Sequence, residues 1–261
     1  MFRETLREET SLYPDSYHAE RGHVLHPAIE RCKRLGFAKF YEQLPRPSRS
    51  SPRLLEVGCG TGLGLEAAAA LGWRVEGIEP VAPAAREAQR RVPEARVWHA
   101  GWGEEEAPPE AAFDAIALFD VLEHFPRPHE AMSLLAERLR PSGCLLIVTP
   151  NAASLSCRLL RGRWPHLLLE HACLYTPRAL RKLCAAHGLR LVSRRFAWKH
   201  VCLDMLLRHW EIYPHVVGGA WLRPIAERAP ARLRSRPFRW NIGEMLCLAQ
   251  KNEAQTEATG V

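Results

Sequence analysis

Short apolar segments alternate with segments of helical pattern along most of this 261-residue chain. Apolar runs predict buried strands at 53–57, 73–79, 95–100, 113–119, 143–149, 189–198 and 241–251. Helices are expected at 62–72, 83–92, 128–139 and 176–188. Strands separated by helices are joined by crossovers, which favour parallel strands with helices on both faces of the sheet. The chain is therefore predicted to be an α/β protein with a mostly parallel sheet.

Two segments fall outside this alternation. Residues 1–52 combine a helical pattern with a polar, proline-rich linker, and residues 200–238 mix aromatic and basic side chains. We therefore expect an N-terminal helical cap and linker at 1–52, a core at 53–199, a basic aromatic insertion at 200–238, and a last strand with its tail at 239–261.

The cysteine pattern and the first residues bear on the compartment. Eight cysteines are scattered without a Cys-x-x-Cys pair, and the chain starts with charged residues instead of a secretory leader. Both features favour a reducing environment. No apolar run approaches the ~18 residues of a membrane-spanning helix. These patterns predict a cytoplasmic protein without a transmembrane segment.

Positive charge is concentrated in the last part of the chain. The formal charge is +2 over residues 1–52, −6 over 53–150 and +11 over 151–261. Within 200–238, tryptophan and tyrosine beside arginine suit a solvated cap, an anionic or lipid-linked small molecule, or peripheral contact with membrane headgroups. Nucleic acid is disfavoured, because no RNA-binding signature accompanies the charge.

A glycine cluster follows the first predicted strand and opens the first helix, in the segment LLEVGCGTGLGLE (54–66). Gly58, Gly60 and Gly62 have no Cβ, so a ligand can lie against the backbone. The spacing departs from the dinucleotide fingerprint G-x-G-x-x-G, whose third glycine would fall on Leu63. By itself the loop is therefore consistent either with a nucleotide-type ligand or with a tight turn that binds nothing.

Two acidic residues narrow the choice of ligand. Glu79 ends the second strand, about 20 residues beyond the loop, where a carboxylate can accept both hydroxyls of a ribose. Glu56 lies just before the loop, where its charge would repel a pyrophosphate. The same charge would suit the ammonium and sulfonium groups of S-adenosylmethionine, either directly or by orienting the loop.

Four segments in order resemble the successive motifs of class I S-adenosylmethionine-dependent methyltransferases: LLEVGCGTG, VEGIEP, FDAIALFDVLEHFPRPHEAM and LRPSGCLLIVTPN. The chain is most similar to the bacterial group related to ubiquinone-biosynthesis O-methyltransferases, over about residues 53–198 and the final strand. The resemblance implies a Rossmann-like, doubly wound sheet of seven strands with an antiparallel last strand and a helical insertion before it. It also implies S-adenosylmethionine as the cofactor.

The resemblance assigns cofactor roles to matching residues. The methionine and ribose part would be lined by Glu56, Gly58, Cys59, Gly60 and Gly62. The adenosine would contact Glu79 through its ribose, and Pro80, Gly101 and Trp102 through its adenine. The methionyl group would face Asp120 and Val121, and its carboxylate would be gripped by Arg21. A surface aromatic is the alternative interpretation of Trp102, and helix capping is the alternative for Asp120.

Methyl transfer is an in-line displacement, so the protein mainly aligns the acceptor and excludes water. A general base helps where the acceptor must lose a proton. The candidates are His124, after the fourth strand, and His171, before the helix at 176–188, with His166 and Glu170 close by in sequence. A structural role is the alternative for both histidines. No metal site is predicted, because no spacing such as H-E-x-x-H is present.

Together these observations predict a methyltransferase that acts on a small molecule, with oxygen as the expected acceptor atom. Two alternatives stay open: a non-catalytic protein that binds the cofactor, and a nicotinamide-dependent oxidoreductase. The intact cofactor motifs argue against the first alternative. Glu56 and the missing third glycine argue against the second.

Overall fold

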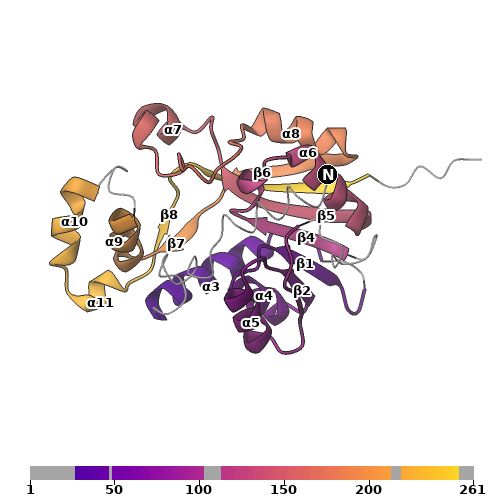
Figure 1. Ribbon diagram of the computed structural model, residues 1–261, viewed down its shortest axis with the longest axis horizontal. Coiled ribbons are helices and arrows are strands. Elements are labelled where there is room, and N and C mark those ends of the chain that lie inside the picture. Colours follow the sequence, from indigo (N-terminus) through magenta and orange to yellow (C-terminus); the bar gives the residue numbers. More distant parts are fainter. Residues whose placement is uncertain (1–26, 47–48, 103–112, 213–218, 253–261) are drawn as a thin grey trace, which may run out of the picture.

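The computed structural model describes residues 27–46, 49–102, 113–212 and 219–252. Within them, one seven-stranded sheet has the strand order β3-β2-β1-β4-β5-β9-β6 (Figure 1). Its strands are β1 (Arg53–Val57), β2 (Arg74–Ile78), β3 (Arg96–Trp98), β4 (Phe113–Phe119), β5 (Leu139–Pro150), β6 (Leu189–Phe196) and β9 (Glu244–Lys251). Neighbouring strands are parallel except β9, which is antiparallel to both β5 and β6. The predicted fold class is confirmed.

Helices cover both faces of the sheet. α4 (Leu63–Ala70), α5 (Ala82–Arg91) and α3 (Pro27–Tyr41) lie on one face, and α6 (Pro128–Arg138) and α8 (Pro177–Ala186) lie on the other (Figure 1). In the part of the chain that the structure describes, no helix has the length and apolarity needed to cross a membrane.

The two faces of the sheet form two hydrophobic cores. On β4, Ile116 and Leu118 pack with α6 and α8, whereas Ala115 and Ala117 pack with α4 and α5. All four side chains are fully buried. Because such strands are covered on both faces, they read in the sequence as continuous apolar runs. This is why the apolar runs predicted them.

Four short elements that follow β5 and β6 in the chain were not predicted from the sequence. A short helix, α7 (Leu155–Leu160), follows β5 and continues into a 3-10 turn, η2 (Arg161–Arg163). A two-stranded antiparallel ribbon joins β7 (Lys199–Val201) to β8 (Phe238–Trp240). Strands of three residues carry too little alternation to be recognised in a sequence.

The ribbon carries the helices of the insertion, which are α9 (Leu203–Ile212), α10 (Gly219–Glu227) and α11 (Ala231–Arg234). Figure 1 shows these helices beyond the ribbon, at the end of the molecule where α3 lies. Cys32 of α3 packs with Cys202 at the start of α9 in a small buried cluster. This contact joins α3 to the insertion.

The strand order places a crevice at the carboxyl ends of β1 and β4. The chain runs outward from β1 through β2 to β3 on one side and continues with β4 and β5 on the other. Ligands of such sheets bind where the strand order reverses, outside the carboxyl ends of the strands. The glycine loop, Glu79 and Asp120 follow β1, β2 and β4, and therefore reach this crevice.

One glycine of the loop fixes the packing of two helices. Gly62 has a φ of 80°, and a Cβ there would lie 2.9 Å from Ala88 Cα of α5. We expect Gly62→Ala to lower the free energy of unfolding by about 2–5 kcal/mol, because left-handed backbone costs ~1–2 kcal/mol and overpacking costs ~1–3 kcal/mol.

Gly72→Ala is the matched control for this prediction. Gly72 has a φ of 88°, but a Cβ there would meet no atom within 4 Å. This variant should lose only the conformational part, about 1–2 kcal/mol. Urea denaturation of both variants measures the difference, and equal losses would contradict the packing role of Gly62.

Candidate functional site

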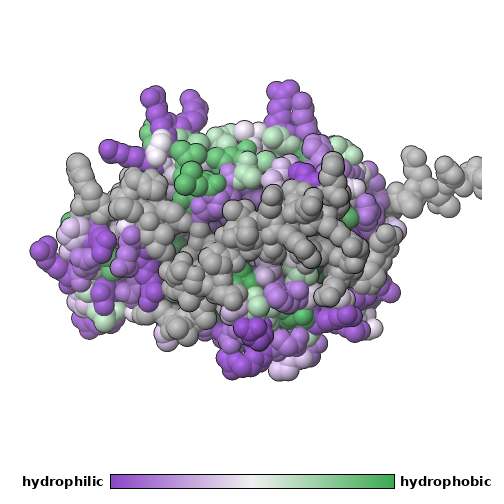
Figure 2. All heavy atoms as spheres, viewed as in Figure 1, coloured by the Kyte–Doolittle hydropathy of each residue, from purple (hydrophilic) through white to green (hydrophobic). Residues whose placement is uncertain are grey.

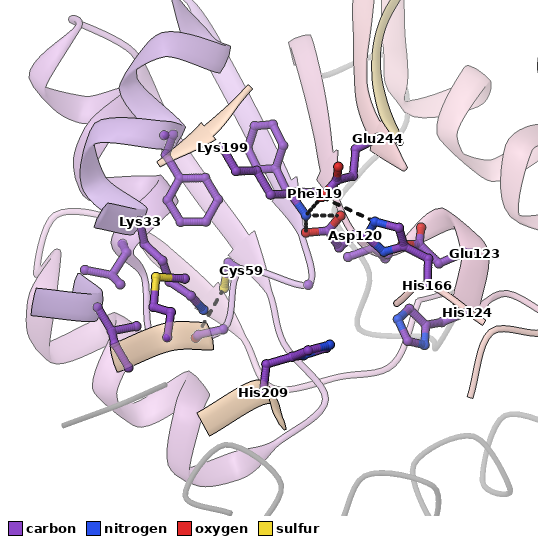
Figure 3. A pocket seen from close by; sticks show the side chains of 18 of the residues that line it. Lys33, Cys59, Phe119, Asp120, Glu123, His124, His166, Lys199, His209 and Glu244 are labelled. Atoms are coloured by element: carbon purple, nitrogen blue, oxygen red, sulfur yellow. Dashed lines mark hydrogen bonds and ion pairs between the residues drawn. The ribbon is translucent and has the colours of Figure 1, made fainter. Parts of the chain in front are cut away.

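A cavity of about 660 Å³ lies at the carboxyl ends of the central strands. Its walls come from the glycine loop, the ends of β2 and β4, helix α3, the segment after α7, and the insertion. Figure 3 shows charged side chains from several of these elements pointing into one region. The volume falls in the range of about 300–1,000 Å³ that is typical of small-molecule sites.

The glycine loop is attached to β2 by backbone hydrogen bonds. The N–H groups of Gly58 and Cys59 donate to Ile78 O at 2.8 and 3.0 Å. Gly58 and Gly60 have φ angles of 70° and 54°, which favour glycine. A Cβ on Gly58 would lie 2.6 Å from Val121 Cγ2. The loop therefore packs directly against the residues that follow β4.

Glu79 connects the glycine loop to the turn after β2. Its side chain is buried, with one oxygen accepting from Gly60 N at 2.8 Å and the other from Val81 N at 3.0 Å. A carboxylate oxygen can accept more than one hydrogen bond, so both oxygens keep capacity for a ligand. The ribose-binding role of Glu79 remains a prediction that this geometry permits.

Glu56 was expected to supply negative charge to the site, but the structure places its carboxyl where the neutral form is favoured. Its carboxyl is 2% exposed and lies under the loop, where a Cβ on Gly64 would overlap it. Burial raises the pKa of Glu56 to about 8, although the nearby Tyr41 hydroxyl acts in the opposite direction. Glu56 Oε2 has no hydrogen-bond partner of normal geometry among the described residues. At neutral pH the side chain is therefore protonated, and it supports the loop from beneath.

Trp102 is a core residue and not a surface aromatic. Its side chain is 7% exposed, and Nε1 donates to Ala131 O of α6 at 3.3 Å. The Arg138 guanidinium lies 5.2 Å from the centre of the ring. The surface interpretation was wrong because α6 covers the loop that carries Trp102.

Asp120 forms an ion pair and does not cap a helix. Its carboxylate accepts two hydrogen bonds from Lys199 Nζ, at 2.9 and 2.8 Å. The 3-10 turn η1 (Leu122–His124) begins after Val121 and has no side-chain cap, so the capping interpretation was wrong. Asp120 also has a φ of 56°, a left-handed conformation that aspartate tolerates better than most residues.

Lys199 extends this ion pair into a network, which Figure 3 shows. Lys199 Nζ lies 3.3 Å from Glu244 Oε1, and His166 Nε2 lies 3.4 Å from the same oxygen. Burial acts to raise the pKa of Glu244, but Lys199 and His166 outweigh it and hold the pKa well below its usual range. The opposing carboxylates raise the pKa of Lys199 despite its burial. Both groups therefore stay charged.

The two candidate catalytic histidines face each other beside this network. Their rings meet edge to face, with the centroids of His124 and His171 separated by 4.8 Å. His124 Nδ1 lies 3.1 Å from Glu170 O, and His171 Nδ1 lies 2.8 Å from His166 O. Burial lowers the pKa of His171, so its imidazole is neutral at physiological pH.

Glu123 lies next to the two histidines. It is 1% exposed, and Thr149 Oγ1 donates to its Oε2 at 2.9 Å. Burial, with a contribution from Asp120, raises the pKa of Glu123 to about 8. The sequence analysis did not single out Glu123, because a lone acid on a short turn has no distinguishing spacing.

The cavity brings together most of the predicted site residues. It is lined by Glu56, Gly58, Cys59, Gly60, Glu79, Pro80, Gly101, Trp102, Asp120, Val121, His124 and His171. Gly62 was expected to line the cofactor site but does not line the cavity. Its Cα faces α5, so Gly62 serves packing between the loop and that helix. Arg21 lies outside the described residues. The sequence analysis missed Lys199 and Glu244, which also line the cavity.

Comparison with known proteins shows the family and the fold of the chain. A family model described as a methyltransferase domain matches residues 29–194. The ubiquinone biosynthesis O-methyltransferase of Paracidovorax citrulli is 29% identical over 157 residues, which cover 55% of this chain and 65% of that protein. The mitochondrial ubiquinone biosynthesis O-methyltransferase of Mus musculus is 35% identical over 122 residues, which cover 44% and 33%. The matches therefore span about a third to two thirds of these relatives.

A solved structure agrees with the fold over nearly the whole chain. The 1,6-didemethyltoxoflavin-N1-methyltransferase of Burkholderia thailandensis, solved with S-adenosylhomocysteine, has a TM-score of 0.60 at 20% identity. The match covers 96% of this chain and 90% of that chain. At this identity the likeness concerns the fold alone.

Replacing Glu79 tests the nucleoside end of the cavity. We expect Glu79→Ala to weaken S-adenosylhomocysteine binding by about 1–3 kcal/mol, because buried hydroxyl and amide donors would lose their acceptor. Glu76→Ala is the matched control: Glu76 is buried on β2, the strand that Glu79 follows, but it pairs with Arg53 and does not line the cavity. Calorimetric titration measures both. An unchanged affinity in Glu79→Ala, or equal losses in both variants, would contradict the role.

The protonation of Glu56 predicts a dependence of stability on pH. Its folded pKa of about 8 lies above the ordinary glutamate pKa of 4.5, so the folded chain retains a proton that the unfolded chain loses in this range. The stability that Glu56 contributes is present below pH 4.5 and is lost as pH rises towards 8.

Glu56→Gln removes this titration. The free energy of unfolding of the parent chain, relative to Glu56→Gln, should fall between pH 5 and 8 by up to about 1.4 kcal/mol per pH unit. Urea denaturation at several pH values measures the difference. A constant difference across this range would show that the buried carboxyl is not protonated.

Proposed function

The chain belongs to the methyltransferase family that its residues 29–194 match, and we propose that it transfers a methyl group from S-adenosylmethionine to an oxygen of a small-molecule acceptor. The observation that carries this proposal is the single cavity. It joins the glycine loop and Glu79 at one end to Lys199, His124 and His171 at the other. A nucleoside and an acceptor therefore have adjoining places in one cavity.

The residues present fit S-adenosylmethionine. Gly58 and Gly60 form a cradle that side chains would fill, and Glu79 offers acceptor oxygens beside it. Trp102 and Pro80 add apolar surface to the same end. When bound, the cofactor supplies a methyl group already activated by its sulfonium charge.

The protein's own contribution is to orient the acceptor and to exclude water. Val121 packs against Gly58 and lines the cavity beside the glycine loop. Helix α3 contributes Phe37 and Phe40 to the walls, and the insertion contributes Met205 and Leu206. These apolar walls keep water away from the reacting groups.

The polar end of the cavity supports an oxygen acceptor. A hydroxyl must lose its proton when it is methylated, and His124 and His171 lie where the acceptor would enter. The relatives in Paracidovorax citrulli and Mus musculus are named O-methyltransferases, which agrees with this choice. His124 and His171 therefore remain the candidates for activating the acceptor.

An apolar or lipid-linked acceptor fits the surface beside the cavity. Leu155 and Leu159 of α7 are 67% and 71% exposed, and Arg158 and Arg161 flank them. Figure 2 shows apolar side chains gathered in this region and edged by hydrophilic ones. Leucine beside arginine suits contact with an anionic lipid surface. The insertion also exposes apolar side chains beside arginine, among them Leu222 and Leu233.

An acceptor panel tests the proposal. Purified protein is incubated with S-adenosylmethionine and simple phenols, prenylated phenols in anionic vesicles, or matched amines, and the products are identified by mass spectrometry. We expect methylated phenolic oxygen, with faster turnover of the prenylated phenols. Cofactor binding without any methylated product would favour the non-catalytic alternative, and methylated amines alone would refute the choice of oxygen.

His171→Ala should lower turnover at least about 100-fold, the smaller end of the usual range for a group that assists proton loss. Affinity for S-adenosylhomocysteine should be retained, because His171 lies at the opposite end from Glu79. His129→Ala, an exposed histidine paired with His187 at 3.1 Å, is the matched control and should keep full turnover. Equal activity in the two variants would exclude His171 from acceptor activation.

A further inference from the structure

A buried carboxylate lies behind His166, one of the histidines that line the cavity. His166 Nε2 lies 3.4 Å from Glu244 Oε1, and Figure 3 shows the two side chains beside each other and close to Lys199. His166 follows the turn η2, whereas Glu244 begins strand β9. The Nδ1 atoms of His124 and His171 instead face backbone carbonyls. His166 therefore has a charged partner of its own.

Glu244 is held in place by the turn that precedes β9. Ile242 N donates to Glu244 Oε2 at 3.0 Å, while Oε1 faces His166 and lies 3.3 Å from Lys199 Nζ. Burial acts to raise the pKa of Glu244, but Lys199 and His166 hold the pKa well below its usual range. Glu244 is therefore ionised at neutral pH, and its oxygens only accept hydrogen bonds.

His166 is supported from the same turn by Trp164. The Trp164 indole Nε1 donates to Ile242 O at 2.9 Å, and its ring meets the His166 ring edge to face, with the centroids 5.0 Å apart. Trp164 is fully buried, so this support is rigid. Ile242 thus binds Glu244 through its N–H and the neighbour of His166 through its carbonyl, which fixes the imidazole and the carboxylate relative to each other.

The contact with Glu244 determines which nitrogen of His166 carries the proton. Nε2 is buried and has no hydrogen bond of normal geometry among the described residues, so Glu244 Oε1 is the acceptor available to it. Such contacts are often long until a substrate binds. Because Glu244 only accepts, Nε2 carries the hydrogen and Nδ1 carries the lone pair. Nδ1 is not a buried atom and has no hydrogen bond in the described part of the chain, so its lone pair is accessible from the cavity.

His166 is better placed than His171 to keep a proton. Burial, with a contribution from the nearby His166 ring, lowers the pKa of His171, so the His171 imidazole resists a positive charge. His171 Nδ1 donates to His166 O, which is a neutral acceptor. The carboxylate of Glu244, by contrast, stabilises the positive charge that the His166 imidazole gains with a proton.

We propose that His166 accepts the proton that the acceptor hydroxyl loses, with Glu244 as its positioning residue. The proposal rests on the proposed function, in which a hydroxyl must lose its proton. The O–H bond breaks, the oxygen keeps the electron pair, and the proton forms an N–H bond with Nδ1 of His166. The imidazolium then pairs with Glu244 until it releases the proton to solvent water. His171 orients the hydroxyl and does not keep its proton.

Acceptors of different acidity test this role. Turnover of the parent chain, His166→Gln and Glu244→Gln is measured with phenol and with 4-nitrophenol at mildly alkaline pH, where 4-nitrophenol is largely ionised and phenol is not. We expect His166→Gln to lower the turnover of phenol by about 10²–10⁴-fold, the usual range for a side chain that transfers a proton, and that of 4-nitrophenol much less. Glu244→Gln should show the same difference between the two acceptors, because a glutamine amide can donate to Nε2 and place the ring proton on Nδ1.

The tautomer of His166 can be measured without any acceptor. Long-range proton–nitrogen correlation spectra of full-length protein labelled with nitrogen-15 histidine distinguish the two ring nitrogens. We expect the Nε2–H tautomer for His166 in the parent chain, identified by the loss of its signals in His166→Gln, and a change of tautomer in Glu244→Gln. His129→Gln is the matched control, because His129 pairs with His187 on the surface, and it should keep the turnover of both phenols.

Circular dichroism and S-adenosylhomocysteine affinity confirm that each variant is folded. An Nδ1–H tautomer of His166 in the parent chain would overturn the proposal. Equal losses of turnover with phenol and 4-nitrophenol would also overturn it, since they would show that His166 serves only the structure. Failure of the parent chain to methylate either phenol would instead refute the proposed function, and the tautomer would still decide how His166 and Glu244 are arranged.

Discussion

The two hydrogen bonds that Glu79 accepts are the interaction on which the nucleoside end of the cavity depends. One oxygen binds Gly60 N and the other binds Val81 N, so a single side chain joins the loop after β1 to the start of α5. Backbone N–H groups stabilise the buried carboxylate. The glycines accept the left-handed backbone that this connection requires. The notch is therefore formed before a ligand binds, and less ordering is needed on binding.

A second connection joins the insertion to this core. Lys199 lies at the base of the ribbon and pairs with Asp120 after β4 and with Glu244 on β9. The family match ends at residue 194, so the ribbon and the insertion that complete the acceptor end lie beyond it. The residues proposed to bind the cofactor thus lie in the part that the family model matches, while much of the proposed acceptor wall lies beyond it. This division explains how one fold serves different acceptors.

The sequence predicted the sheet well, because strands buried on both faces read as apolar runs between helices. It also located the glycine loop and Glu79, whose spacing is fixed by the first βαβ unit. Lys199 and Glu244 could not be found, since they meet Asp120 only through the tertiary fold. The charge of Glu56 was misjudged because desolvation under Gly64 depends on packing. Glu123 was missed for a related reason. It lies on a short turn, and its hydrogen-bond partner Thr149 is distant in sequence.

The central claim is that the notch between β1 and β2 is built for a sulfur nucleoside. Calorimetric titration of the parent chain with S-adenosylhomocysteine and, separately, with NAD tests it most directly. We expect one S-adenosylhomocysteine per chain and no heat of binding from NAD at the same concentrations. Binding of NAD in place of S-adenosylhomocysteine would contradict it.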